Sequence, residues 1–145
     1  MPMIDLTFVR GSVDDPSLRR LTDELVTVLL RAEQAPDTPF LRDNTVVYLH
    51  ALEPAAQSVG GRGPGQPRFR VELTVFAGAL SDGRKEQLVA DVHAAVCAAA
   101  GLDPKGSRAL HVWTLIHEVP EGNWAGAGKV ISYGDVKGLV ADDTP

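Results

Sequence analysis

Pro2 is the residue of this chain with the clearest chemical potential, because it directly follows the initiator methionine. Inside a chain its nitrogen is part of an amide and is not basic. If Met1 is removed, which the small second residue favours, the nitrogen becomes a secondary amine held rigid by the proline ring. An ordinary α-amino group titrates near ~7.7–8.0, and burial or a neighbouring cation would lower that pKa. A neutral amine of this kind is a general base, and its conjugate acid returns the proton elsewhere.

Other side chains that often carry chemistry form no recognisable site. The four histidines show no metal-ligand spacing, and the run from His117 to Glu121 resembles the start of a zinc-protease helix but lacks its second histidine. Cys97 lies in an alanine-rich apolar stretch, so we interpret it as a packed thiol. As the single cysteine, it permits no disulfide within the chain. We therefore expect neither a metal nor an organic cofactor.

Length and composition predict one globular domain over residues 1–145. Hydrophobic residues make up 44% and charged residues 23% of the chain, the balance of an ordinary folded protein. A net charge of -5 gives no footprint for nucleic acid or an anionic membrane surface. No stretch reaches the roughly 18 apolar residues of a spanning helix, and no signal peptide is recognisable, so we expect a cytoplasmic location.

The elements that must position Pro2 begin immediately after it. The segment Met3–Val9 alternates apolar and polar residues as a strand does. Asp14-Asp15-Pro16 then offers a helix start, and apolar residues at helical spacing follow. Thr45–Leu52 is β-branched and apolar enough for a second strand. Together these segments predict one β-α-β unit over about residues 2–58.

The same pattern restarts after a connection rich in glycine and proline. Val71-Glu72-Leu73-Thr74 repeats Ile4-Asp5-Leu6-Thr7 at an offset of 67 residues, and the helix pattern repeats at the same offset. The second helix should run from near Ser81 to Gly101, and a last strand should cover Leu110–His117. Glu53 also echoes Glu118 at an offset of 65. We predict a second unit over about residues 69–130 and a C-terminal extension over 131–145.

The two units together predict an α/β fold of the two-layer α+β kind. Each crossover implies a parallel strand pair with a right-handed connection. Two such pairs form one four-stranded mixed sheet with two helices on one face. Because the strands are strongly apolar, we expect the open face to be buried in an oligomer.

Pro2 before a strand, the duplication, and the string from His117 to Gly128 together resemble the tautomerase superfamily. The resemblance covers nearly the whole chain. The double length is similar to fused 4-oxalocrotonate tautomerases, malonate semialdehyde decarboxylase, cis-3-chloroacrylic acid dehalogenase and macrophage migration inhibitory factor. It implies a homotrimer and a cofactor-independent tautomerase that uses Pro2 as general acid–base on a small enol or α-keto acid. Phe69 takes the place of Pro2 in the second unit, which implies one site per chain.

The sequence departs from this family where relatives bind carboxylates. Ser12 follows the first glycine where an arginine is expected, and Ala77–Leu80 carries no charge. Trp113 occupies the second-strand position of another family arginine. The resemblance then implies an aromatic pocket.

Four residues are the candidate substrate contacts in that pocket, and each has a structural alternative. They are Trp113, Trp124, Asn123 and Arg42. The tryptophans are as well suited to core or interface packing. Asn123 either hydrogen-bonds a substrate or shapes a turn. Arg42 lies where macrophage migration inhibitory factor has a lysine, yet it is also typical of a solvated loop arginine. Two functional alternatives stay open: a non-catalytic trimeric binding protein and a Pro2-dependent hydratase or decarboxylase.

Overall fold

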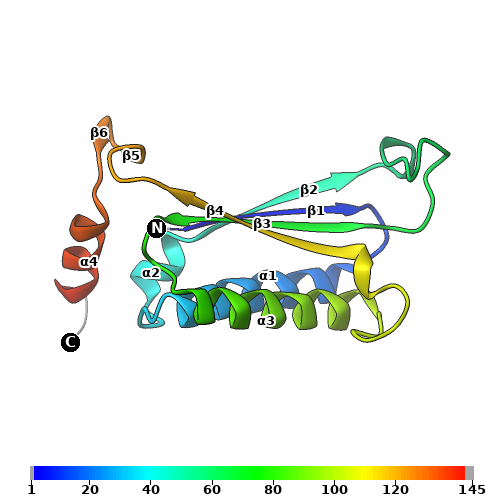
Figure 1. Ribbon diagram of the computed structural model, residues 1–145, viewed down its shortest axis with the longest axis horizontal. Coiled ribbons are helices and arrows are strands. Elements are labelled where there is room, and N and C mark those ends of the chain that lie inside the picture. Colours follow the sequence, from blue (N-terminus) through cyan, green and yellow to red (C-terminus); the bar gives the residue numbers. More distant parts are fainter. Residues whose placement is uncertain (1, 143–145) are drawn as a thin grey trace.

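The computed structural model describes residues 2–142 and contains the four-stranded mixed sheet that the sequence predicts (Figure 1). Its strands are β1 (Met3–Val9), β2 (Val46–Leu52), β3 (Phe69–Phe76) and β4 (Val112–Val119), arranged in the order β2-β1-β3-β4. The pairs β1–β2 and β3–β4 are parallel, and the central pair β1–β3 is antiparallel. The two predicted parallel pairs are therefore confirmed.

Two long helices, α1 (Asp15–Ala32) and α3 (Asp82–Ala100), lie side by side on one face of this sheet (Figure 1). Each begins at the predicted cap. The Asp14 carboxylate accepts a hydrogen bond from the Ser17 amide at 2.8 Å, and the Ser81 hydroxyl caps α3 in the same way. α3 ends at Gly101 in the left-handed conformation (φ 63°).

The core fills the space between these helices and the sheet. Strand residues that point toward the helices alternate with residues that point away. The fully buried residues of the core include Ile4, Leu6, Val71, Leu73 and Val75 from the strands, and Leu25, Leu29, Leu88, Val92 and Val96 from the helices.

Strand pairing carries the internal repeat through both units in one register. Thr7 lies opposite His50 in the first unit, and Thr74 lies opposite His117 in the second. The offset of 67 residues therefore holds for the second strands as well as the first. The proposed equivalence of Glu53 with Glu118 at an offset of 65 is wrong, because backbone pairing, not residue identity, sets which positions correspond.

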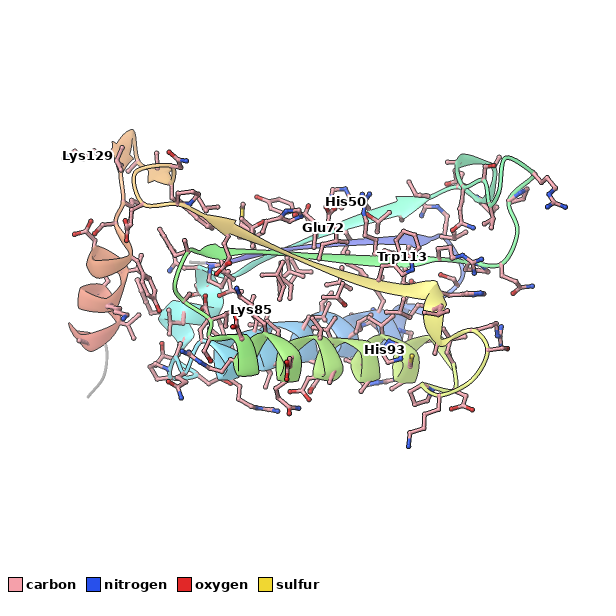
Figure 2. The ribbon with its side chains drawn as sticks, viewed as in Figure 1. His50, Glu72, Lys85, His93, Trp113 and Lys129 are labelled. Carbon is pink, nitrogen blue, oxygen red and sulfur yellow. The ribbon has the colours of Figure 1, made fainter. Side chains whose placement is uncertain are left out.

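The open face of the sheet is less apolar than the sequence suggested. The central strands place charged and polar side chains there, because these residues alternate with the buried core residues. These include Asp5, Thr7, Arg70 and Glu72. His50 Nε2 lies 2.6 Å from the Asp5 carboxylate, and His117 Nε2 lies 3.2 Å from that of Glu72. Figure 2 shows His50 and Glu72 on the side away from the helices.

Exposed apolar residues on this sheet belong instead to the edge strands. Val46 and Tyr48 are exposed on β2, and Trp113 and Leu115 on β4. The expectation of an apolar face that needs covering therefore applies to the edges of the sheet and not to its centre.

Several short elements were not predicted. They are α2 (Pro39–Asp43), the 3-10 helices Pro54–Ala56 and Ala109–His111, the hairpin strands β5 (Ala125–Gly126) and β6 (Lys129–Val130), and α4 (Tyr133–Asp142). The second 3-10 helix delays β4 to Val112, two residues later than expected. Within residues 2–142, no helix combines the length and apolarity that crossing a bilayer requires.

Candidate active site at the chain's amino terminus

Pro2 is buried directly before β1, at the end of the sheet where β3 also ends. Its neighbour Met3 pairs with Thr74, so the antiparallel pairing brings the beginning of β1 to the last residues of β3 and the loop after it. The hairpin β5–β6 and helix α4 lie at this same end of the molecule (Figure 1). Segments that are far apart in the sequence therefore meet at the end of the sheet where Pro2 lies.

Glu33, the residue that follows α1, supplies a carboxyl group at this end. Its side chain is half-buried, and burial raises the pKa of the carboxyl above its ordinary value. The positive charges of the chain's amino terminus and of Arg84 act in the opposite direction. Among the residues described, the Glu33 carboxylate has neither a hydrogen-bond donor nor an ion-pair partner.

Arg84, in the first turn of α3, supplies a cation. Its Nη1 donates to the carbonyl oxygens of Ala32 and Ala79, at 3.3 and 3.0 Å, and its Nε donates to the Ser81 hydroxyl at 3.2 Å. Ala32 directly precedes Glu33, and Ala79 lies in the loop after β3. These bonds anchor the guanidinium between the two segments. Its Nη2 has no partner within residues 2–142, so it remains available to an anion.

Three aromatic rings stack beside these groups. Phe76, the last residue of β3, stacks on Trp124 with a centroid separation of 4.6 Å and on Tyr133 with one of 5.7 Å. Burial raises the pKa of the Tyr133 phenol, and the charge of Glu33 raises it further while Arg84 lowers it. Tyr133 is thus close enough to both charged groups to interact with them. Its hydroxyl has no hydrogen-bond partner among the described residues.

This arrangement has the features of an active site for proton transfer. Pro2, a carboxyl, a guanidinium and a phenol come from four separate segments and are partly withdrawn from water. Ionisable groups in such surroundings have shifted pKa values and unused hydrogen-bonding capacity, which are typical of catalytic groups. Within the described part of the chain, no three His, Cys, Asp or Glu residues lie close enough together to hold a metal ion.

Of the four predicted substrate contacts, two lie at this end. Trp124 stacks on Phe76, as described. Asn123 is exposed in the turn before Trp124, where its backbone N–H donates to the Pro120 carbonyl at 3.1 Å. The structure thus brings Pro2 and Trp124 together at one end of the molecule, with Asn123 beside them.

Trp113 lies at the opposite end of the sheet. It pairs with Arg70, which in turn pairs with Thr7. Thr7 is five residues along β1 from Pro2, or about 17 Å at the rise of a strand. The indole Nε1 donates to the Leu110 carbonyl at 2.9 Å, and the side chain is exposed (Figure 2). Within one chain, Trp113 and Pro2 do not share a pocket.

Arg42 is occupied by its own neighbours. Its Nε and Nη2 bind both carboxylate oxygens of Asp37, at 2.6 and 2.8 Å, and its Nη1 binds Asp23 at 2.8 Å. Nη2 also donates to the Thr27 hydroxyl at 2.8 Å. These contacts hold α2 against α1. Arg84, and not Arg42, is the arginine with a free donor near Pro2.

The sequence contained one signal for the residues that were missed. At an offset of 67, Glu33 corresponds to Ala100 and Arg84 corresponds to Ser17. Both charges therefore appear where the two units differ. The search for a repeat draws attention to positions where the units agree, which are mainly the core residues.

Comparison with known proteins gives a family match for the second unit and a structural match for most of the chain. Residues 70–133 match the family model described as "Tautomerase enzyme". This range extends from β3 to the first residue of α4. No curated protein sequence matches the chain.

Solved structures resemble the chain over most of its length. A fused 4-OT solved as a symmetric trimer has a TM-score of 0.73 at 19% identity, covering 92% of this chain and 98% of that chain. A member of the cis-3-chloroacrylic acid dehalogenase family has a TM-score of 0.72 at 20% identity, covering 99% and 92%. A fused 4-OT solved as an asymmetric trimer has 0.71 at 17%, covering 88% and 94%. At these identities, what the chains share is the fold.

The family's sequence pattern thus lies in the second unit, and its duplicated fold extends over both units. The second unit thus matches the tautomerase family model, and the whole chain has the duplicated fold of the fused 4-OT and cis-3-chloroacrylic acid dehalogenase family structures.

Proposed function

We propose that this protein is a cofactor-independent tautomerase that acts on a small enol or α-keto acid. The nitrogen of Pro2, freed by removal of Met1, is the general acid–base. The observation that carries this proposal is the placement of Pro2: it is buried at the end of the sheet where β3 ends, and Arg84, anchored to Ala32 and to the loop after β3, brings the half-buried Glu33 to the same end. A terminus without a function is more commonly exposed and mobile.

The proposed reaction moves one proton between carbon and oxygen. In the direction of the ketone, the Pro2 ammonium donates a proton to the carbon as the enol oxygen loses one. In the reverse direction, the neutral amine removes the proton from carbon. A positioned acid–base group of this kind contributes roughly 10²–10⁴-fold to a rate.

Arg84 and the aromatic stack complete the proposed substrate site. The free Nη2 of Arg84 donates to the substrate carboxylate, with the guanidinium held in place by its bonds to Ala32 and Ala79. The rings of Phe76 and Trp124 pack against the apolar part of the substrate. Arg84 thus takes the orienting role that the sequence assigned to Arg42.

We further propose that the protein assembles as a homotrimer. The trimers among the similar solved structures support this, as do the exposed apolar residues of both edge strands. In such an assembly, Trp113 would reach a Pro2 site only from a neighbouring chain. Light scattering at micromolar protein concentration tests the assembly, and a monomer would contradict it.

Ketonisation of phenylenolpyruvate by the wild type and by Pro2→Ala tests the proposed catalytic role. Intact mass must first establish that Met1 is absent from both proteins, because a retained Met1 converts the proline nitrogen to an amide. We expect kcat/KM of Pro2→Ala to fall at least about 10²-fold, the lower end of the contribution from a general acid–base. Equal rates in the two processed proteins would overturn the proposal.

A further inference from the structure

We propose that Glu33 is the second catalytic group of this site and exchanges the proton on the substrate oxygen while Pro2 exchanges the one on carbon. This inference rests on the proposed tautomerase function and extends it. Moving a proton from oxygen to carbon requires a base at one atom and an acid at the other. Pro2 is a single group, so a second group at the oxygen allows both transfers without waiting for solvent.

Glu33 is a poor structural residue in its position. It directly follows α1, where the helix dipole is negative and a carboxylate is disfavoured. It is half-buried, which costs hydration energy, and no donor or cation among the described residues compensates through a hydrogen bond or an ion pair. Fold stability alone gives no reason for a glutamate here.

The backbone beside Glu33 carries a second local cost. Gln34 has φ 56°, a left-handed conformation that a non-glycine residue adopts unfavourably. It is held there by two backbone hydrogen bonds, both 3.0 Å long: the Gln34 N–H donates to the Arg31 carbonyl, and the Ala35 N–H donates to the Leu30 carbonyl. Strained backbone of this kind is found preferentially at functional sites. The same bonds end α1 sharply and fix the backbone from which the Glu33 side chain projects.

The second unit provides the matched case without a site. There the equivalent residues are Ala100 and Gly101, and the equivalent hydrogen bond, from the Leu102 amide to the Cys97 carbonyl, is 2.9 Å. The same helix end therefore forms with an uncharged residue and a glycine. The glutamate and the strained glutamine occur only at the end that holds the terminal amine.

A bound enol supplies a donor that the Glu33 carboxylate does not find among residues 2–142. With the substrate carboxylate on Arg84 Nη2, the enol hydroxyl donates to Glu33. The groups that face Glu33 electrostatically are the terminal amine, Arg84 and Tyr133. The phenol of Tyr133 is a neutral donor, so it does not compete for the proton.

The proposed step balances without any added reactant. The enol O–H bond breaks and its proton passes to a Glu33 carboxylate oxygen, while the C–O bond becomes C=O. The C=C bond becomes a single bond as its electron pair takes a proton from the Pro2 ammonium. Glu33 is then a carboxylic acid and Pro2 a neutral amine. Transfer of one proton from Glu33 to Pro2 restores both groups.

Steady-state ketonisation of phenylenolpyruvate by Glu33→Gln tests this inference. We expect kcat to fall at least about 10²-fold with little change in KM, because the amide keeps the size of the side chain but accepts no proton. Glu33→Asp should recover part of the loss. Glu24→Gln, a change at an exposed glutamate of α1, should leave kcat unchanged.

The pH profile gives a readout that a structural role would not produce. The wild-type kcat should fall as the pH drops through the raised pKa of Glu33, because only the carboxylate accepts the proton. The acidic limb should be missing in Glu33→Gln. Its thermal stability should match or exceed that of the wild type, since a half-buried unpaired charge is removed.

A Glu33→Gln protein with kcat within about twofold of the wild type would overturn the inference, as would an unchanged acidic limb. Pro2→Ala separates this result from a failure of the proposed function. If Pro2→Ala is inactive and Glu33→Gln is active, only the role of Glu33 is wrong. If Pro2→Ala keeps full activity, the proposed function itself is wrong.

Discussion

The two ends of the sheet are built from equivalent parts of the repeat, yet they differ in how the long helix of each unit ends and in the groups around that end. At the Pro2 end, α1 is followed by Glu33 and Gln34, the latter at φ 56°. At the Phe69 end, α3 closes with Ala100 and Gly101, the latter at φ 63°. Glycine enters this conformation without a steric penalty. The helix end at the Phe69 side therefore has an unstrained backbone, whereas the helix end at the Pro2 side carries the steric cost of a left-handed glutamine.

Polar side chains at the Phe69 end are bonded mainly within their own loops. Gln57, which corresponds to Trp124, donates to the carbonyls of Pro64 and Gln66 and accepts from the Arg68 amide. Arg10 forms an ion pair with Glu53 at 2.7 Å. One nitrogen, Arg68 Nη1, is buried without a partner. A cavity of about 310 Å³ remains, lined by loop residues that include Arg10, Ser12, Pro54, Gln57 and Pro67.

The difference shows how a duplicated fold separates support from chemistry. Both units keep the strands, the helix caps and the core, which any copy needs to fold. Among the described residues, the unpaired Glu33 carboxylate and the free Nη2 of Arg84 lie at the Pro2 end, whereas the internal Phe69 offers no nitrogen that can exchange a proton.

Loss of the cation should give the largest effect. Arg84→Ala removes a charge-assisted hydrogen bond to the substrate carboxylate, a contact worth about 1.5–3 kcal/mol. We expect kcat/KM to fall about 10- to 100-fold, mainly through KM, because the contact is present before the reaction as well as during it. Arg10→Ala removes an arginine from the Phe69 end and should leave the kinetics unchanged. Equal effects of the two substitutions would contradict the distinction between the ends.

Exchange of the helix ends should change stability in opposite directions. Gln34→Gly relieves the left-handed glutamine and should raise the free energy of unfolding by about 1 kcal/mol. Gly101→Gln introduces the same strain into α3 and should lower it by about the same amount. Urea titrations of the two variants measure both changes. If Gln34→Gly is neutral or destabilising, the backbone at the Pro2 end is not strained.

Arg42→Ala should affect the fold and not the reaction. Its guanidinium holds α2 to α1 through Asp37, Asp23 and Thr27, but these contacts are largely at the surface. We expect unfolding to become easier by less than about 1 kcal/mol. KM for phenylenolpyruvate should not change. A several-fold rise in KM would restore Arg42 as a substrate contact and weaken the assignment of that role to Arg84.

The four long strands, the two long helices and the duplication could all be predicted from the amino-acid sequence. Alternating apolar residues define β1 and β3, and the caps at Asp14, Ser81 and Gly101 are visible as local motifs. These features depend on neighbours within a few residues, so they can be recognised without a structure. Strand boundaries were less secure, because the 3-10 helix before β4 depends on how the connection packs.

Tertiary packing, in contrast, sets which residues lie at the same end of the sheet as Pro2. Glu33, Arg84 and Tyr133 lie in separate segments, and none belongs to a motif with Pro2. The antiparallel pairing of β1 with β3 brings these segments to one end of the sheet and carries Trp113 to the other. The burial that raises the pKa of Glu33 also arises only from that packing. A site made by contacts across the chain has no local pattern, which is why the sequence pointed to Pro2 and Trp124 but not to the charged residues at the same end of the sheet.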